Sequence, residues 1–352
     1  MRIRLRLEAT LQRAWMHRGA LACLLWPVAW AYSGLVRLRR QLFRWDILKT
    51  QRVPAVVIVV GNVMAGGVGK TPSVISIVRH LQAQGRKVGV VSKGYGRQSK
   101  DCLEVQSETS VHACGDEPLL IHKATQAPVL VAQSRWVAST ALLNRYPDTE
   151  IIVCDDGLQD YTLHRDIEIC VFDDRACGNG WLLPAGPLRD HWPRPRMAMC
   201  GANAENLLLI NTGNTPVTGQ FQAQRSLGEG LKDIQGNTVA WSQLAQWQGL
   251  PLKALAGIAR PAVFFQMLRE NGVVLAQTQA LPDHFHIAPD TLAALQPCQI
   301  ICTEKDASKV WAHDPKAFSS ALTQTIEPAF FDALHQHIAR TDPPRLSSHH
   351  GH

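Results

Sequence analysis

Closely spaced cysteine pairs, the usual sign of metal and redox sites, are missing from this sequence. Its nine cysteines lie mostly in apolar runs and none forms a CxxC pair, so we expect reduced thiols in a cytoplasmic compartment. Internal repeats are missing as well. Acidic residues are the scarcer charge, with 29 Asp and Glu against 36 Lys and Arg. The resulting net charge of +7 favours an anionic partner, such as nucleic acid, anionic lipid or a phosphorylated substrate.

A long apolar run without a charge lies near the N-terminus, at residues 19–36. As a helix it would measure about 27 Å, just short of the hydrocarbon core of a bilayer. Arginines flank it on both sides, Trp26, Trp30 and Tyr32 lie within it, Pro27 would kink it, and no clear signal-peptide cleavage site follows. The run is either an apolar helix packed on its own domain or a membrane-bound helix. If it is membrane-bound, both a spanning and an interfacial position remain open.

A strand, a glycine-rich turn and a helix follow one another at residues 55–85. The run Ala55–Val60 is apolar throughout, as in a buried parallel strand, and Gly85 ends the helical pattern. The turn brings backbone amides and a helix N-terminus to a phosphate, Lys70 reaches the terminal phosphates, and the Thr71 hydroxyl holds Mg²⁺. The predicted nucleotide-binding residues are Asn62, Gly66, Gly67, Val68, Gly69, Lys70, Thr71 and Pro72.

Two positions of this turn depart from common phosphate loops. Met64 stands where the first glycine of the usual spacing is expected. Ala65 stands where the partitioning and cell-division ATPases carry a lysine that acts across their dimer. The missing lysine argues against that class of ATPase.

Strand and helix patterns alternate along the first part of the chain, which predicts a doubly wound, mostly parallel α/β sheet. After about residue 213 the texture changes, and a second set of short strands and helices begins. We therefore expect four parts, namely an N-terminal membrane-associated helical segment at 1–50, a P-loop domain at 51–215, a smaller α/β domain at 216–330, and a C-terminal helix with a flexible tail at 331–352. Further strands of the P-loop domain are expected at 87–92, 128–132, 151–154 and 167–172.

Two acidic pairs occupy positions where catalysis and metal binding need carboxylates. Asp155 and Asp156 end an apolar strand, which is where nucleotide sites place an acid that organises Mg²⁺. An acidic turn on an exposed edge is the alternative. Asp116 and Glu117 begin a helix, and helix capping alone would also explain them.

Other candidate site residues carry weaker signals. His284 lies on the loop LPDHFHIAPD of the second domain, where a lone histidine is ordinarily a surface residue. Gln159 follows the paired acids. Basic side chains can bind substrate anions or can simply be solvated; these are Lys93, Arg97, Arg135 and Arg189.

Together these pieces form an ordered series of motifs. The chain carries in turn VGNVMAGGVGKTP, GRKVGVVSKGYGR, GDEPLLI, VCDDGLQDYTLHRDIEICVFD, GNGWLLPAGPLRD, LPDHFHIAPD and CTEKDASKV. The series resembles the tetraacyldisaccharide 4'-kinase family, the lipid A 4'-kinases of Gram-negative bacteria, over most of the chain. The family's loop also lacks glycine at the position of Met64.

The resemblance implies ATP-dependent transfer of the γ-phosphoryl group to the 4'-hydroxyl of a tetraacyldisaccharide 1-phosphate, which forms lipid IVA. It implies two α/β domains joined by a short β-ribbon, at the cytoplasmic face of the inner membrane. Asp116 then matches the family's base and His284 its assistant, with Lys70 also catalytic. The metal positions match Thr71, Glu117, Asp155 and Asp156. From the residues themselves, we expect substrate binding at Lys93, Arg97, Gln159 and Arg189.

The cofactors implied are ATP and Mg²⁺, and the partners are the lipid substrate and a membrane surface, with no nucleic acid and no obligatory protein partner. Two other hypotheses belong to different classes. One is a membrane-docked P-loop ATPase or GTPase switch that does not phosphorylate lipid, and the other is a lipid carrier that uses nucleotide only for structure.

Overall fold

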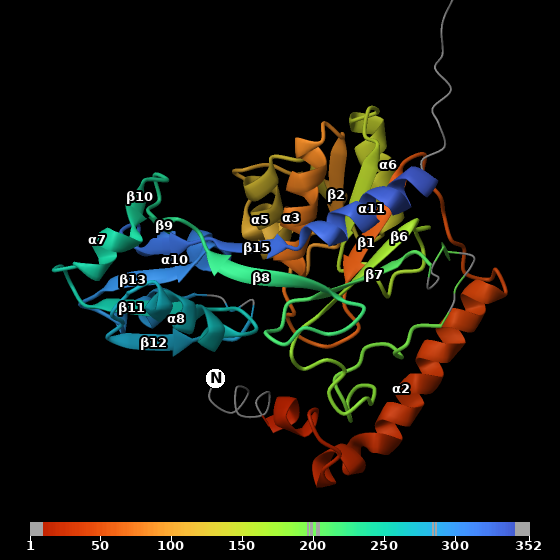
Figure 1. The fold of residues 1–352 in the computed structure, drawn as a ribbon, viewed down its shortest axis with the longest axis horizontal. Coiled ribbons are helices and arrows are strands. Elements are labelled where there is room, and N and C mark those ends of the chain that lie inside the picture. The colour runs from red at the N-terminus through yellow and green to blue at the C-terminus, as the bar shows by residue number, and fades with distance from the viewer. Residues whose placement is uncertain are drawn as a thin grey trace, which may run out of the picture.

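The structure, a computed structural model, describes residues 10–195, 197, 200–201, 205–283, 285 and 287–341. Two separate β-sheets divide it into a larger first lobe and a smaller second lobe (Figure 1). The nine-stranded sheet of the first lobe has the order β15-β8-β7-β6-β1-β5-β2-β4-β3. Its strands are β1 (Val56–Gly61), β2 (Val88–Ser92), β3 (Leu103–Val105), β4 (Val129–Val131), β5 (Ile151–Asp155), β6 (Ile167–Phe172), β7 (Leu207–Asn211), β8 (Phe221–Leu227) and β15 (Leu322–Ile326).

Helices cover both faces of this sheet, as the alternation of strands and helices predicts. Side chains at even positions of β1, such as Ile58, join a core beneath α3, α5 and α11, whereas Val57 and Val59 join a second core beneath α6. The strands are parallel except at the edges, where β3 runs antiparallel to β4 and β15 antiparallel to β8. The helices are α3 (Lys70–Ala83), α4 (Val111–Cys114), α5 (Asp116–Thr125), α6 (Arg135–Arg145) and α11 (Pro328–Thr341). The doubly wound, mostly parallel sheet is therefore confirmed.

The second lobe is built on a six-stranded sheet of order β10-β9-β14-β13-β11-β12. Its central strands are parallel, and β9 runs antiparallel to both β14 and β10. The strands are β9 (Gly230–Lys232), β10 (Thr238–Ala240), β11 (Leu252–Ala256), β12 (Gln277–Ala280), β13 (Gln299–Thr303) and β14 (Phe318–Ser320). The helices are α7 (Trp241–Ala245), α8 (Pro261–Glu270), α9 (Pro289–Ala293) and α10 (Glu304–Trp311).

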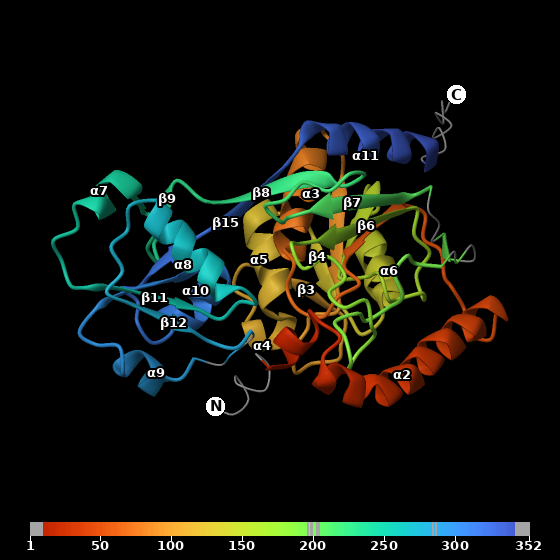
Figure 2. The same ribbon diagram turned by 60° about the horizontal axis from the view of Figure 1, so that its bottom comes forward.

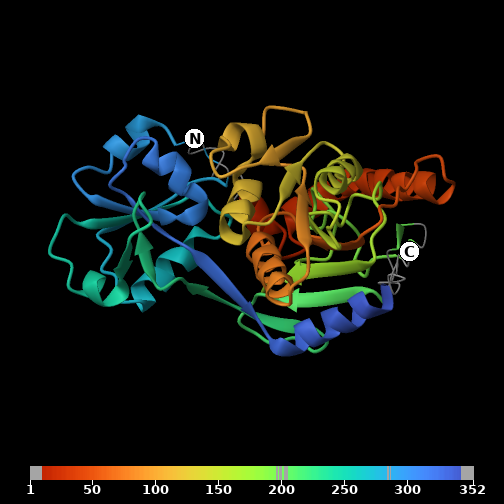
Figure 3. The same cartoon turned by 90° about the horizontal axis from the view of Figure 1, so that it is seen from above.

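The two lobes are joined by the antiparallel pair β8 and β15, as Figure 3 shows from above. Leu227 pairs with Leu322 at the end nearer the second lobe, and Ala223 pairs with Ile326 at the other end. After β15 the chain returns to the first lobe as α11, whose Phe330 and Leu334 are fully buried in its core. The β-ribbon therefore links two lobes that each have a core of their own.

The N-terminal apolar run forms part of α2 (Ala20–Arg44), which lies along the outside of the first lobe (Figure 2). By length and composition it is the one helix of the described chain able to cross a membrane, with a mean hydropathy of 1.4 over 18 residues. The helix continues through Pro27. Its buried residues recur at spacings of seven and four, which defines one stripe facing the protein; they include Ala22, Ala29, Ser33 and Arg40. The opposite face is apolar and exposed.

Candidate active site

The glycine-rich turn lies between β1 and α3, as the sequence predicts. Gly66 and Gly69 adopt φ angles of 93° and 94°, in the left-handed region that only glycine enters freely. A Cβ on Gly69 would also lie 2.4 Å from Nη2 of Arg225. The turn therefore ends in free amides at the N-terminus of α3, an arrangement suited to phosphate.

Met64 has a structural role in this turn. It forms an antiparallel bridge with Leu188, the Ala65 N–H donates to the Pro187 carbonyl at 2.7 Å, and the Arg189 N–H donates to the Val63 carbonyl at 2.7 Å. The Met64 side chain is 1% exposed and joins the core beneath α6. The first half of the turn is therefore a short paired strand, and a large apolar residue fills the place of the missing glycine.

Lys70 and Arg189 converge on Asn62 and Asp156. The Lys70 Nζ lies 3.3 Å from Asn62 Oδ1 and 3.6 Å from Asp156 Oδ2. Arg189 donates to both carboxylate oxygens of Asp156, at 3.0 and 2.9 Å, and to Asn62. Burial would raise the pKa of Asp156, but Lys70 and Arg189 hold it well below its usual range. Asp156 is therefore a carboxylate already neutralised by the protein.

Asp155 has a different environment, although it is the neighbouring residue. Its side chain is buried, Oδ2 accepts from Ser92 Oγ at 3.3 Å, and Oδ1 has no hydrogen-bond partner in the described chain. Burial, and then the charges of Glu117 and Asp156, raise the pKa of Asp155 to about 7. A buried carboxyl with an unused oxygen and acidic neighbours gains stability from a cation.

Asp116 and Glu117 both lie in the first turn of α5 but face different cavities. Glu117 lines the pocket that also contains the glycine-rich turn, whereas Asp116 lines a neighbouring cleft with Tyr95 and Lys123. Each carboxylate pairs with a lysine of α10 in the second lobe. Lys309 Nζ lies 2.5 Å from Asp116 Oδ2, and Lys305 Nζ lies 3.6 Å from Glu117 Oε1.

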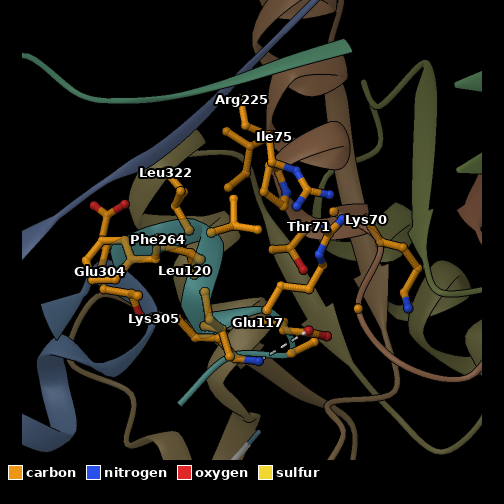
Figure 4. Close-up of a pocket in the computed structure, with 18 of the residues that line it drawn as sticks. Lys70, Thr71, Ile75, Glu117, Leu120, Arg225, Phe264, Glu304, Lys305 and Leu322 are labelled. Atoms are coloured by element: carbon orange, nitrogen blue, oxygen red, sulfur yellow. Dashed lines mark ion pairs between the residues drawn. The ribbon is translucent and has the colours of Figure 1, made fainter. Parts of the chain in front are cut away.

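The two lobes also meet around the pocket beside the glycine-rich turn (Figure 4). Gly67, Lys70 and Thr71 line it from the first lobe, and Arg260 and Phe264 line it from the second. A Cβ on Gly67 would lie 2.7 Å from the Cβ of Ala259. The second lobe therefore forms one wall of the predicted nucleotide site.

Sequence reasoning did not identify the charged residues that the second lobe and the ribbon bring to this pocket. Arg225 of β8 donates to the Val68 carbonyl at 2.5 Å, and Arg260 lies 3.5 Å from Asp173. Burial, and then the nearby charge of Arg260, lower the pKa of Arg225 to about 10. One signal could have indicated Arg260. It ends the strand–loop pattern ALAGIAR, at the carboxyl end of a parallel strand, where ligands commonly bind.

The remaining basic candidates differ in position. Lys93 Nζ lies 3.0 Å from Asp160, whereas Arg97 donates to the backbone carbonyls of Lys100 and Asp101. Arg135 is buried and stabilises the turn after β5, because it donates to the backbone carbonyls of Asp155 and Asp156.

Gln159 donates to the Asn62 carbonyl at 2.8 Å, which places it beside the glycine-rich turn. Pro72 and Thr71 also line the nucleotide pocket. His284 lies outside the described residues, so its predicted role stays a prediction.

A doubly wound sheet with a phosphate loop, and a carboxylate facing a second cavity beside it, defines a P-loop phosphotransferase. A family model described as tetraacyldisaccharide-1-P 4'-kinase matches residues 21–341. The chain therefore belongs to the tetraacyldisaccharide 4'-kinase family, as its motifs predict.

Individual relatives agree with this assignment. The chain is 49% identical over 351 residues to the tetraacyldisaccharide 4'-kinase of Polaromonas naphthalenivorans, covering 98% of this chain and 99% of the relative. It is 48% identical over 335 residues to that of Acidovorax ebreus, covering 95% of each. The crystal structure of LpxK from Aquifex aeolicus in complex with ATP superimposes with a TM-score of 0.73 at 25% identity, over 92% of this chain and all of that one.

Proposed function

We propose that this chain transfers the γ-phosphoryl group of ATP to the 4'-hydroxyl of a tetraacyldisaccharide 1-phosphate, the reaction named by its family and relatives. The similar fold of an ATP-bound member supports ATP as the donor. One observation carries the assignment of sites. Adjacent residues of α5 face two cavities, Glu117 the phosphate-loop pocket and Asp116 the neighbouring cleft. A phosphoryl group passing between donor and acceptor has to cross this boundary.

Asp116 is the proposed base of the reaction. A sugar hydroxyl is a weak nucleophile, and a carboxylate within hydrogen-bond reach accepts its proton as the new oxygen–phosphorus bond forms and the bond to ADP breaks. Asp116 is buried at the head of α5, so its position is fixed by the helix and by Lys309. Lys70 at the end of the glycine-rich turn stabilises the charge of the transferring group.

Mg²⁺ is the proposed cofactor, and the residues present fit it. No three His, Cys, Asp or Glu side chains of the described chain form a complete metal cage. Mg²⁺ does not require one, because it commonly binds one or two carboxylates together with water and substrate phosphates. Thr71, Glu117 and the unused oxygen of Asp155 are the proposed ligands. Asp156, already paired with Lys70 and Arg189, acts by orienting those side chains. When bound, the ion would neutralise phosphate charge.

We further propose that the enzyme works on the membrane surface, at the cytoplasmic face of the inner membrane. The exposed face of α2 carries large apolar residues, with Leu24 76% exposed and Trp30 71% exposed. The opposite stripe is docked on the first lobe along the whole helix. A helix docked in this way favours an interfacial position, from which a lipid-bound sugar reaches the cleft while its acyl chains stay in the bilayer.

One assay tests the activity. Purified full-length protein is incubated with radiolabelled ATP, Mg²⁺ and the disaccharide 1-phosphate in detergent, and the lipid product is counted. Label in the lipid supports the kinase. Free phosphate alone would indicate a switch, and lipid binding without turnover a carrier.

The role of Asp116 is tested by Asp116→Asn, which should lower kcat by about a hundredfold to ten-thousandfold because a general base is removed. ATP affinity should stay within about threefold, since Asp116 faces the other cavity. Asp290→Asn is the matched control, because Asp290 is an exposed first-turn acid of α9. A parallel loss of turnover and ATP affinity in Asp116→Asn would instead point to a role in metal binding.

A further inference from the structure

Three consecutive residues of the first lobe connect α2 to the active site. The Tyr32 hydroxyl donates to the Arg189 carbonyl at 2.9 Å, Arg40 forms an ion pair with Asp190, and Ser33 Oγ lies 3.0 Å from His191 Nε2. Ser33 and Arg40 belong to the buried stripe of α2, and Tyr32 beside Ser33 is half-buried.

Of these three residues, Arg189 is also tied to the phosphate loop. The Arg189 N–H donates to the Val63 carbonyl, and its guanidinium holds Asn62 and both oxygens of Asp156. Arg189 thus contacts α2 through its carbonyl and contacts the active site through its amide and its side chain. Its peptide cannot shift without moving both.

The Arg40–Asp190 pair is the ion pair among these contacts, and it is buried. Both side chains are nearly inaccessible, at 7% and 2% exposure. Asp190 is further held by the Tyr161 hydroxyl at 3.1 Å. Arg194 Nε lies 3.8 Å from Asp190 as well, so loss of Arg40 would leave Asp190 with a single, more distant cation. Burying an arginine on the inner stripe of an apolar helix costs free energy unless the guanidinium is paired with a carboxylate.

We propose that Arg40, through Asp190, is a positioning residue for Arg189, so that the docked α2 helps to hold the phosphate-binding side of the active site in its working geometry. The helix then contributes to turnover as well as to membrane attachment. This inference rests on the proposed function, since the geometry concerned is that of phosphoryl transfer.

The test compares Arg40→Met with Arg40→Lys, and uses Arg37→Met as a control because Arg37 is an exposed arginine one turn away on the same helix. In detergent micelles at saturating lipid, Arg40→Met should lower kcat about tenfold, as expected when Arg189 and the Asp156 carboxylate that it holds beside Lys70 are misplaced. The KM for ATP and the binding to anionic lipid vesicles should change less than twofold. Arg40→Lys should recover part of kcat, and Arg37→Met should leave kcat unchanged.

Hydrogen exchange gives a readout that does not depend on activity. The amides of Ala65 and Arg189 pair with the Pro187 and Val63 carbonyls, so their exchange should speed up in Arg40→Met and stay unchanged in Arg37→Met. If wild-type protein phosphorylates no lipid, the proposed function fails. The hydrogen exchange of these two amides still tests whether Arg40 positions Arg189. Should Arg40→Met not fold, Tyr32→Phe, which removes one hydrogen bond to Arg189, should show the same effects in weaker form. Unchanged exchange and kcat, with only vesicle binding lost, would overturn the proposal.

Discussion

Met64 shows how one residue can replace a motif position and leave its function intact. A phosphate loop needs amides and a helix N-terminus near the phosphate, and these come from Gly66 to Lys70. The first half of the turn is instead held by the bridge to Leu188. Glycine there would leave a hole in the core and loosen the chain.

Met64→Gly should therefore destabilise the protein and not improve the nucleotide site. Removal of a buried methionine costs about 2–5 kcal/mol, and the added backbone freedom about 1 kcal/mol more. Urea unfolding measures the loss, and ATP titration should show no gain in affinity. Met64→Leu is the control, because a swap of similar volume costs less than about 1.5 kcal/mol. Equal stability of the glycine and leucine variants would contradict this account of the bridge.

The site residues that could be predicted are those that follow the strands of a single parallel sheet. The turn from Gly66 to Thr71 follows one strand, and Asp155 ends another, so the parallel sheet alone brings them to one edge. Lys305 and Lys309 reach the same region from a second lobe. Nothing local separates such lysines from solvated ones, because their partners lie almost 200 positions earlier in the chain.

At the scale of elements, α2 divides its surface into two faces with different tasks. The stripe of Ala22, Ala29, Ser33 and Arg40 meets the protein, and the outward side carries exposed Leu24 and Leu35. The sequence predicted the helix but not which side faces the protein, because apolar residues surround it on nearly every side. The ion pair of the buried Arg40 with Asp190 fixes which side of the helix faces the protein.

Leu24→Ser combined with Leu35→Ser should weaken vesicle binding while the docked stripe stays intact. Each side chain contributes about 1.5–3 kcal/mol when removed from water, so partition should fall at least tenfold. Flotation with anionic vesicles measures it. Turnover on detergent-dispersed substrate should change little. Val274→Ser, an equally exposed apolar site in the second lobe at 80% exposure, is the control. Unchanged flotation of the double variant would exclude this face of α2 from membrane contact.

At the scale of the whole molecule, two lobes meet over the nucleotide pocket and ion pairs hold them together there. Lys309 binds Asp116 and Lys305 binds Glu117 across the two lobes, and Lys305 also binds Asp283 of its own lobe at 2.8 Å. Burial would lower the pKa of Lys305, but Glu117 and Asp283 raise it above its ordinary value. Arg260 of the second lobe adds an ion pair with Asp173, 3.5 Å away, and the ribbon of β8 and β15 links the two lobes covalently. We therefore expect closure of the two lobes to depend on a few ion pairs and on the nucleotide bound in the pocket.

The double variant Lys305→Met, Lys309→Met should open the lobes in the absence of nucleotide. Loss of two partly buried charge pairs shifts the closed–open equilibrium by about tenfold to a hundredfold toward the open state. Small-angle X-ray scattering should then give a larger radius of gyration than for wild type, and ATP should reduce it because both lobes line its pocket. Lys316→Met, an exposed lysine of the second lobe, should leave the scattering unchanged. If the double variant scatters as wild type without ATP, the contact of Ala259 with Gly67 and the apolar wall around Phe264 must hold the lobes together without the lysines. In that case the two lysines position the carboxylates of α5 and do not hold the lobes closed.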